Sequence, residues 1–235
     1  MFFVDYINGK KIVRSDLITE VDNFFTTRDI CIQSREFDLS ENKRIIEDYL
    51  GQKLAVNKPV HGVDIAEVVD SKFIYENVDG LVFKKGTAGH LYFADCVPLI
   101  FYCNGVVMIS HAGWRGTVKN MAKHSVEKFV KDYGCKEEDI KAVIGPAVCF
   151  KCYEVGEEVY DALWATVIDR ENIFLKEKNK YFVDLKGINK QQLLECGVKQ
   201  IDVCPYCTNC GEKLFYSYRY ENQTSFRHSA IVKCV

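Results

Sequence analysis

The 235-residue sequence predicts an α+β fold in which helices cover one or more mixed β-sheets. Three observations lead to this fold class. Strand-like runs dominate the middle of the chain, a few segments have helical spacing, and 48% of the residues are hydrophobic, which is enough for a sizeable core. No Gly/Ser-rich linker, low-complexity block or repeat of about 20–50 residues divides the sequence. We therefore expect one domain over residues 1–235.

The N-terminal half contains most of the predicted strands. Phe2–Val13, with Asn8-Gly9 at its centre, is typical of a β-hairpin. Glu41–Leu50 is a predicted helix, with Ser40 as its N-cap. Apolar or alternating runs then predict strands at Val60–Val69, Gly80–Phe83, Leu91–Cys103 and Val106–Ser110.

The C-terminal half carries the clearest helical pattern. Apolar and small residues recur every three or four positions over Thr117–Tyr133, and Gly134 is placed to end this helix. A strand at Ile140–Ile144 and a helix at Gly156–Val167 are predicted next. Asp184 is a possible cap for a helix that ends at Gly197. The predicted closing strands are Phe215–Tyr220 and Ser229–Val235.

The charge and the N-terminus exclude some classes of partner. Lys+Arg 31 against Asp+Glu 33 leaves a net charge of −2, so no basic field predicts nucleic-acid binding, although a local arginine cluster can still bind a small anion. The start MFFVDYINGKK is typical of neither a signal peptide nor a membrane span, and no later apolar run reaches about 20 residues. We expect a cytoplasmic protein without a membrane partner.

The eleven cysteines are expected to stay reduced in that compartment. Their odd number also excludes a fully paired disulfide framework.

Two of the five histidines lie in an unusual context. His61 opens a strand-like run, and His111 ends an apolar strand that leads through a small-residue turn into a helix. Such a junction exposes side chains at the sheet edge, and its first helical amides favour anions. His124 on the polar side of a helix, His90 in a predicted turn and His228 show no comparable pattern.

Arg115 lies in the turn that follows His111. Its guanidinium is a suitable ligand for a phosphate or carboxylate. The alternative is a tight strand–helix connection with a surface arginine.

A polar pair, Asp95-Cys96, interrupts the apolar run Leu91–Cys103. A buried carboxylate is costly unless it is hydrogen-bonded or paired, so Asp95 either orients a histidine or caps a turn. A free cysteine in such a run is commonly a small core residue.

His61, Cys96 and His111 together allow two chemistries. Two histidines and a cysteine supply three zinc ligands and leave a fourth position for water or substrate. Alternatively, a histidine activates Cys96 as a nucleophile, which needs no metal. The spacings of 35 and 15 residues do not decide between them.

The order of several motifs along nearly the whole chain resembles the YfiH or laccase-domain family, also called polyphenol oxidase-like or peptidoglycan editing factor proteins. HAGWRGT and CYEVG are the specific motifs. The matching segments are Phe25-Thr26-Thr27-Arg28, Val60-His61-Gly62, Ala94-Asp95-Cys96-Val97-Pro98, His111-Ala112-Gly113-Trp114-Arg115-Gly116-Thr117, Gly145-Pro146-Ala147, Cys152-Tyr153-Glu154-Val155-Gly156 and Phe215-Tyr216-Ser217-Tyr218-Arg219.

This resemblance implies a layered α/β/β/α fold related to cysteine hydrolases such as cytotoxic necrotizing factor. It implies zinc at His61, Cys96 and His111. The implied activity is phosphorolysis of purine nucleosides (adenosine, inosine, guanosine and methylthioadenosine), with adenosine deamination beside it. A nucleoside and phosphate are then the expected small-molecule partners.

Phosphorolysis requires an anion held close to the ribose, because the glycosidic bond breaks through an oxocarbenium-like state. Arg115 and Arg28 are the predicted phosphate ligands, and Asp95 is predicted to support a ligating histidine. The sequence departs from the family pattern at Asp29-Ile30-Cys31, where a glycine pair is usual after the Thr-Arg motif, and at Phe226-Arg227, where Gly-Arg is usual.

Other functions remain open at this point. Five histidines are too few for a multicopper laccase, so copper chemistry would have to use a single centre built from the same three residues. A metal-independent cysteine hydrolase or amidase acting on a peptidoglycan precursor is the main alternative. A nucleotide-binding or partner-binding module without turnover is the third.

The chain also contains two further cysteine motifs, Cys149-Phe150-Lys151-Cys152 and Cys204-Pro205-Tyr206-Cys207-Thr208-Asn209-Cys210. Paired CxxC motifs favour a structural zinc site. Proteins of the resembled family tolerate cysteine at Cys152 and around Cys207 without an evident metal role. We therefore take reduced structural thiols as the prediction and a second metal ion as the alternative.

Overall fold

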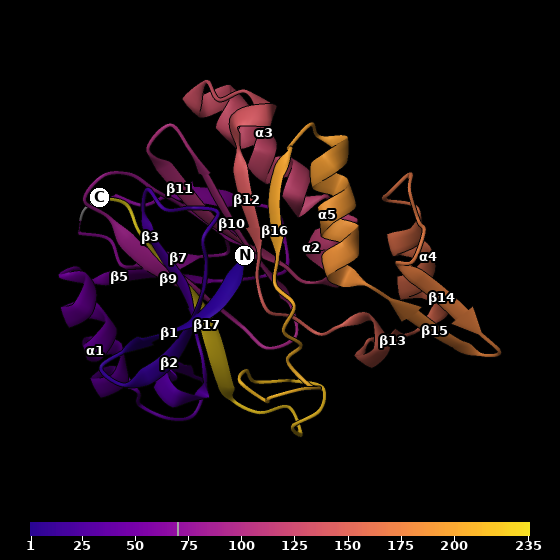
Figure 1. Cartoon of the computed structure of the whole chain (residues 1–235), viewed down its shortest axis with the longest axis horizontal. Coiled ribbons are helices and arrows are strands. Elements are labelled where there is room, and N and C mark those ends of the chain that lie inside the picture. The colour runs from indigo at the N-terminus through magenta and orange to yellow at the C-terminus, as the bar shows by residue number, and fades with distance from the viewer. Residues whose placement is uncertain (70) are drawn as a thin grey trace.

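The computed structural model describes residues 1–69 and 71–235 and contains two large mixed β-sheets (Figure 1). The first has eight strands in the order β1-β2-β3-β17-β9-β5-β7, with β4 paired to β17. Its strands are β1 (Phe2–Ile7), β2 (Lys10–Ser15), β3 (Asp22–Thr26), β4 (Gln33–Ser34), β5 (Leu54–Lys58), β7 (Ile74–Glu76), β9 (Ala88–Phe93) and β17 (Phe226–Lys233).

The second large sheet has six strands in the order β16-β12-β10-β11-β8-β6. Its strands are β6 (Ile65–Glu67), β8 (Gly80–Phe83), β10 (Val97–Cys103), β11 (Val106–Ala112), β12 (Lys141–Ile144) and β16 (Gln200–Val203). A small antiparallel sheet is made of β13 (Glu154–Val155), β14 (Phe174–Glu177) and β15 (Lys180–Val183).

Five α-helices of the described residues lie outside the large sheets. They are α1 (Ser40–Leu50), α2 (Trp114–Val118), α3 (Met121–Tyr133), α4 (Glu157–Trp164) and α5 (Leu185–Glu195), with short 3-10 turns at Arg28–Ile30, Glu137–Asp139 and Phe150–Cys152. Figure 1 shows α1 on one side of the molecule and α3 and α5 on the other, while α4 and the small sheet project at one end.

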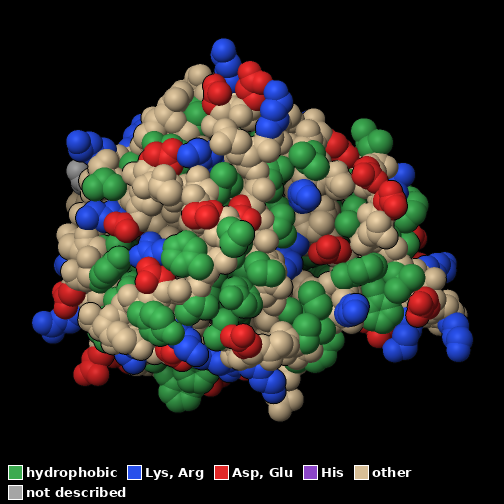
Figure 2. All heavy atoms as spheres, viewed as in Figure 1, with side chains coloured by type: hydrophobic (Ala, Val, Ile, Leu, Met, Phe, Trp, Pro, Cys, Tyr) green, Lys and Arg blue, Asp and Glu red, His purple; other side chains and the backbone are tan. Residues whose placement is uncertain are grey.

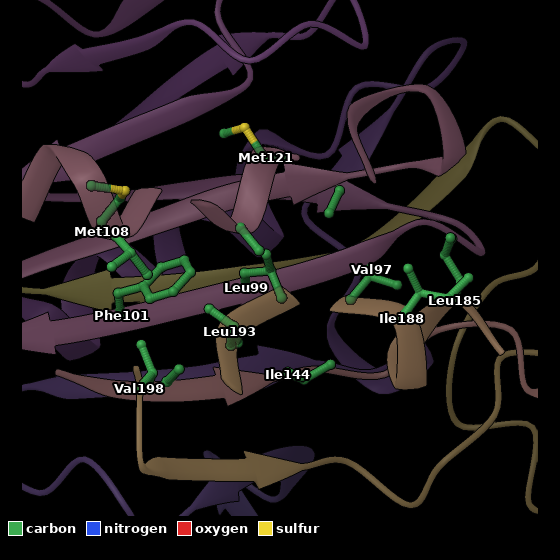
Figure 3. Packing of buried hydrophobic residues seen from close by; sticks show 14 of the residues in the cluster. Val97, Leu99, Phe101, Met108, Met121, Ile144, Leu185, Ile188, Leu193 and Val198 are labelled. Carbon is green, nitrogen blue, oxygen red and sulfur yellow. The ribbon is translucent and has the colours of Figure 1, made fainter. Parts of the chain in front are cut away.

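Strand β10 lies at the centre of the core and is buried on both faces. Leu99 and Phe101 pack with Met121 of α3 and Leu193 of α5 (Figure 3). Ile100, which points the opposite way because side chains alternate along a strand, packs in the layer between the two large sheets. Complete burial of one such side chain contributes about 1.5–3 kcal/mol.

The outer face of the eight-stranded sheet packs against α1. Ile46 and Leu50 of this helix share a cluster with Phe24 and Ile231 of the sheet. The layers are therefore α1, the eight-stranded sheet, the six-stranded sheet, and then α3 with α5. This is the predicted α+β class with the α/β/β/α layering. Figure 2 shows basic and acidic side chains interspersed over one face, in keeping with the near-balanced charge.

Several predicted elements are confirmed with small shifts of their ends. β1 and β2 form the N-terminal hairpin, where Asn8 (φ 50°) and Gly9 (φ 76°) adopt the left-handed geometry of a tight turn. The predicted helices at 41–50, 156–167 and 184–197 correspond to α1, α4 and α5, and the last predicted strand is β17, which begins earlier, at Phe226.

Other predicted boundaries of helices and strands were wrong. The run Leu91–Cys103 is two strands in different sheets, separated by a turn in which Asp95 has φ 80°. The helix Thr117–Tyr133 is α2 followed by α3, because Asn120 adopts a left-handed conformation (φ 59°) that no α-helix continues through. Within Val60–Val69 only Ile65–Glu67 is a strand. Phe215–Tyr220 contains turns instead of a strand.

Two statements about single residues also need correction. His90 lies inside β9 and is buried, not in a turn. Cys103 and Cys135 form a disulfide, so the expectation that all eleven cysteines stay reduced is wrong for this pair. Over residues 1–69 and 71–235, no helix is long and apolar enough to cross a membrane.

Candidate active site

His61, Cys96 and His111 meet at one edge of the sheets, although 35 and 15 residues separate them in the sequence. One potential ligand atom from each lies within 4.8 Å of the other two. The register of β10 and β11 pairs Val97 with Ala112, so Cys96, which precedes β10, lies beside the end of β11 that carries His111. His61 comes from the loop between β5 and β6.

Gly113 makes this close approach possible. A Cβ atom at this position would lie 2.9 Å from Sγ of Cys96 and 3.2 Å from Cδ2 of His61. Any larger residue would therefore push into the space between the three potential ligands. Because position 113 has no side chain, the space between the three residues stays open; we call this space the cradle. Two histidines and one cysteine around it form a donor set that catalytic zinc sites use.

The carboxylate beside His111 belongs to Asp79, which sequence reasoning missed. Asp79 is completely buried, and its Oδ1 lies 3.1 Å from Nδ1 of His111. Because this contact uses Nδ1, Nε2 of His111 is left available to a metal ion or a proton acceptor. One signal could have revealed it: Asp79 directly precedes a fully buried strand, where a carboxylate needs partners.

The same carboxylate holds the loop that carries His61. The backbone N–H groups of Val60, His61 and Gly62 donate to Asp79 at 3.1, 3.0 and 2.7 Å. His61 itself has a left-handed backbone (φ 60°), which is unfavourable for a residue other than glycine unless its surroundings impose it. Asp79 thus positions both histidines, which come from different parts of the sequence.

The Cys96 thiol and the His111 imidazole each shift the other's pKa. Burial alone would raise the pKa of Cys96, but the neighbouring His111 and His61 lower it to about 6. Burial alone would lower the pKa of His111, but Cys96 and Asp79 raise it to about 9. Near neutral pH these shifts favour a thiolate–imidazolium pair. A thiolate is the form that either binds a metal or attacks an electrophile.

A cavity of about 250 Å³ opens directly onto the three residues. Its walls include the aromatic rings of Tyr92, Phe93 and Tyr218. Two arginines, Arg35 and Arg227, line it as well. The cavity therefore combines a potential metal centre, flat apolar surfaces and positive charge.

Arg227 is only 5% exposed, and its guanidinium lies 5.5 Å from the centre of the Tyr218 ring. Burial lowers the pKa of this guanidinium, and the charge of the nearby Arg35 lowers it further. Among the described residues, neither arginine forms an ion pair with a carboxylate. Two neighbouring, unneutralised guanidinium groups form a site suited to an anion.

The arginines that the sequence singled out lie elsewhere. Arg28 donates to the backbone carbonyl of Phe215 at 2.7 Å and pairs with Glu221, so its charge is already neutralised. Arg115 is exposed and lies over the ring of Trp114, 4.2 Å from its centre. Neither lines the cavity.

Asp95 has the second of its two predicted roles. Its Oδ1 accepts a 2.6 Å hydrogen bond from the hydroxyl of Thr208, and its Oδ2 accepts one of 2.8 Å from the backbone N–H of Arg219. It therefore caps the turn that leads to Cys96, while the histidine is oriented by Asp79. The remaining histidines lie apart: His90 and His228 are buried within β9 and β17, and His124 is exposed on α3.

Comparison with known proteins places the chain in a family. Residues 30–234 match the family model described as multi-copper polyphenol oxidoreductase laccase. The chain is 34% identical over 214 residues to purine nucleoside phosphorylase YlmD of Geobacillus stearothermophilus, covering 83% of this chain and 78% of that protein. It is 32% identical over 183 residues to adenosine deaminase RL5 of an unknown prokaryotic organism, covering 71% and 69%.

The fold comparison agrees. The crystal structure of the hypothetical protein YfiH of Bacillus licheniformis superposes with a TM-score of 0.87 at 27% identity, covering 95% of this chain and 96% of that one. The chain therefore belongs to the multi-copper polyphenol oxidoreductase laccase family, which includes the YfiH and YlmD proteins.

Proposed function

We propose that this protein is a zinc-dependent purine nucleoside phosphorylase whose metal ligands are His61, Cys96 and His111. The observation that carries the proposal is the shared cavity: the three potential ligands open onto the same space as Arg35 and Arg227, which form no ion pair with any carboxylate in the described part of the chain. A metal centre and an anion site side by side fit a reaction between a nucleoside and phosphate. The names of the relatives, which include purine nucleoside phosphorylase and adenosine deaminase, support an enzyme of this class.

The donor set fits zinc. Three protein ligands leave one position for substrate, and a bound zinc ion would supply a Lewis acid at the cavity wall. The Asp79 carboxylate next to Nδ1 of His111 is the kind of partner that fixes a ligating imidazole in one tautomer.

The cavity walls suggest how the two substrates are held. Phosphate would lie between Arg35 and Arg227, where its negative charge relieves the repulsion between the two guanidinium groups. The purine would pack against Tyr92, Phe93 or Tyr218, since aromatic faces stack on purine rings. Holding the anion next to the ribose turns a reaction between two solutes into one within a complex. In this proposal Arg35 and Arg227 replace Arg28 and Arg115 as the phosphate ligands.

Three other reactions of the same site follow from the same groups. Without phosphate, attack by water on the purine ring would deaminate adenosine, which is the activity in the name of one relative. The thiolate–imidazolium pair of Cys96 and His111 favours a metal-independent cysteine hydrolase as the second candidate. Single-copper oxidation of phenols would use the same three ligands.

The test measures base release from adenosine and inosine, with and without phosphate, on protein of known metal content. Phosphate-dependent release that is lost in Cys96→Ala and after chelation is the expected result. Activity that survives chelation but not Cys96→Ala would move the assignment to the cysteine hydrolase. Ammonia release without phosphate would indicate deamination.

A pair of arginine variants tests the anion site. Removing a charge-assisted contact costs about 1.5–3 kcal/mol, so Arg227→Met should raise the KM for phosphate by roughly 10–100-fold. The matched control is Arg115→Met, outside the cavity, which should leave this KM unchanged. A raised KM for phosphate in Arg115→Met, with an unchanged KM in Arg227→Met, would instead identify Arg115 as the phosphate ligand. Arg35→Met tests the same anion site independently. Because Arg35 is exposed, its replacement should disturb folding less than replacement of the buried Arg227.

A further inference from the structure

The two additional cysteine motifs converge because of the sheet topology. β12 and β16 are parallel neighbours, with Ile144 opposite Val203. Parallel strands end at the same edge of a sheet, so the segments that follow them begin side by side. One segment carries Cys149 and Cys152, and the other carries Cys207 and Cys210. An isolated bridge between Ala147 and Cys207 continues the pairing beyond the strands.

The four sulfur atoms form a compact cluster. All lie within 4.8 Å of one another, and Sγ of Cys149 is 3.6 Å from Sγ of Cys210. Four thiolates at about 2.3 Å from one tetrahedral zinc ion lie about 3.8 Å from each other. A [4Fe–4S] cluster would hold each cysteine sulfur on a different iron, and a [2Fe–2S] cluster would hold them in pairs on two irons; both spread the four sulfurs further apart. The observed spacing therefore fits a single ion.

Hydrogen bonds to the sulfur atoms support this interpretation. The backbone N–H groups of Cys149 and Asn209 both donate to Sγ of Cys207, each at 3.3 Å. The side-chain amide of Asn209 donates to Sγ of Cys152 at 3.4 Å. Donors that point at sulfur stabilise negative charge there and orient the ligand, as outer partners do in metal sites.

We propose that Cys149, Cys152, Cys207 and Cys210 bind a structural zinc ion, separate from the ion proposed at the active site. Four protein ligands complete the tetrahedral coordination of zinc and leave no position for a substrate. Cys204, the remaining cysteine of the CxxCxxC motif, is buried outside the cluster. The geometry thus replaces our expectation of reduced structural thiols. This inference goes beyond the proposed function and does not depend on it.

The ion would fix a loop that supports the active site. Thr208, next to Cys207, donates to Asp95 at 2.6 Å, and Asp95 caps the turn before Cys96. The backbone N–H of Thr208 also donates to the carbonyl of Ala147 at 3.2 Å. A zinc ion that ties the two segments together would hold Thr208 in this position.

Metal counting tests the proposal directly. When it is purified under reducing conditions from zinc-supplemented medium, the 235-residue chain should contain two zinc ions. Cys149→Ser and Cys210→Ser should each retain one. The matched control Cys204→Ser, from the same motif but outside the cluster, should retain both. Cys96→Ala should lose the active-site ion and retain the ion bound by the four cysteines. The measurement therefore tests each proposed site separately.

Cobalt substitution tests the ligands by spectroscopy. Tetrahedral cobalt bound to four thiolates gives intense sulfur-to-cobalt charge-transfer bands and strong ligand-field bands. In Cys210→Ser these bands should weaken to the smaller contribution of cobalt at the active site, whose one thiolate ligand is Cys96, whereas in Cys96→Ala the four-thiolate bands should persist. Cys210 is exposed, so its replacement is the variant least expected to disturb folding.

Several results would overturn the proposal. One is a single zinc ion per chain that is lost in Cys96→Ala and kept in Cys149→Ser. Another is a Cys149–Cys210 disulfide that forms in the wild type in place of metal binding, which intact-mass measurement under non-reducing conditions would detect. Iron in place of zinc at this site would overturn the choice of metal.

Discussion

Replacing Asp79 by asparagine should weaken metal binding at the active site through His111. The carboxylate accepts hydrogen bonds from three backbone N–H groups and lies beside Nδ1 of His111. An asparagine retains one acceptor oxygen, and its NH₂ group then faces two of the four former donors. The least costly arrangement keeps the oxygen on Val60 and Gly62 and points the NH₂ at His61 and His111.

His111 can adapt to that arrangement only by accepting at Nδ1 and carrying its proton on Nε2. The nitrogen needed by the metal is then protonated, and loss of such a partner typically costs 10–100-fold in metal affinity. The backbone N–H of His61 loses its acceptor, which costs about 1–3 kcal/mol for a buried donor. For a chain of this size that corresponds to a melting temperature lower by roughly 3–10 °C.

Zinc affinity is measured by competition with a chelating dye, and stability by urea unfolding of the metal-free protein. The matched control is Asp64→Asn, which makes the same chemical change at an exposed side chain nearby and should alter stability by less than about 0.5 kcal/mol. If Asp79→Asn binds zinc as tightly as the wild type and unfolds at the same urea concentration, then Asp79 does not position His111 and this reasoning is wrong.

Two further predictions concern the cradle and the buried histidines. Gly113→Ala places a Cβ 2.9 Å from the Cys96 sulfur. An overpacking cost of about 1–3 kcal/mol should lower zinc affinity by about 5–150-fold in the same competition assay. Unchanged affinity would mean that the ligands do not close around this glycine. Burial, followed by the charge of Lys43, lowers the pKa of His90 to about 3, and burial does the same for His228, so the unfolded chain binds protons below pH 6.5 that the native protein does not. Stability should therefore fall as the pH drops, by about 2 kcal/mol per histidine between pH 6.5 and 5. His90→Leu should reduce this slope in urea titrations relative to wild type, whereas the exposed His124→Asn should not; equal slopes in all three proteins would contradict the assigned pKa.

Local sequence patterns predicted much of the secondary structure. Asn8-Gly9 specified the first hairpin because both residues tolerate positive φ, and the three-to-four spacing of apolar residues located most of α3. The patterns failed where tertiary contacts decide the backbone. Within Leu91–Cys103 the polar pair Asp95-Cys96 indicated an interruption but did not show that the chain passes to another sheet there. The turn at Asp95 is stabilised by Thr208 and Arg219, more than 100 residues away.

The same division applies to the candidate site. Residue types and motif order singled out His61, Cys96 and His111, because few side chains bind metals and all three lie in segments that match the family. The contribution of Asp79 depends on hydrogen bonds to residues that are distant in sequence from one another, and Arg35 and Arg227 face the cavity only because β17 pairs with β4 and β9.

The sequence by itself determined the α+β class, the N-terminal hairpin, the main helices and the identity of the three potential ligands. Only the tertiary structure decided which carboxylate orients His111, which arginines face the cavity, and that four cysteines from two motifs meet in one cluster. The physical reason is that strand register and parallel pairing set the distances between side chains, and these depend on the packing of the whole chain more than on any local pattern.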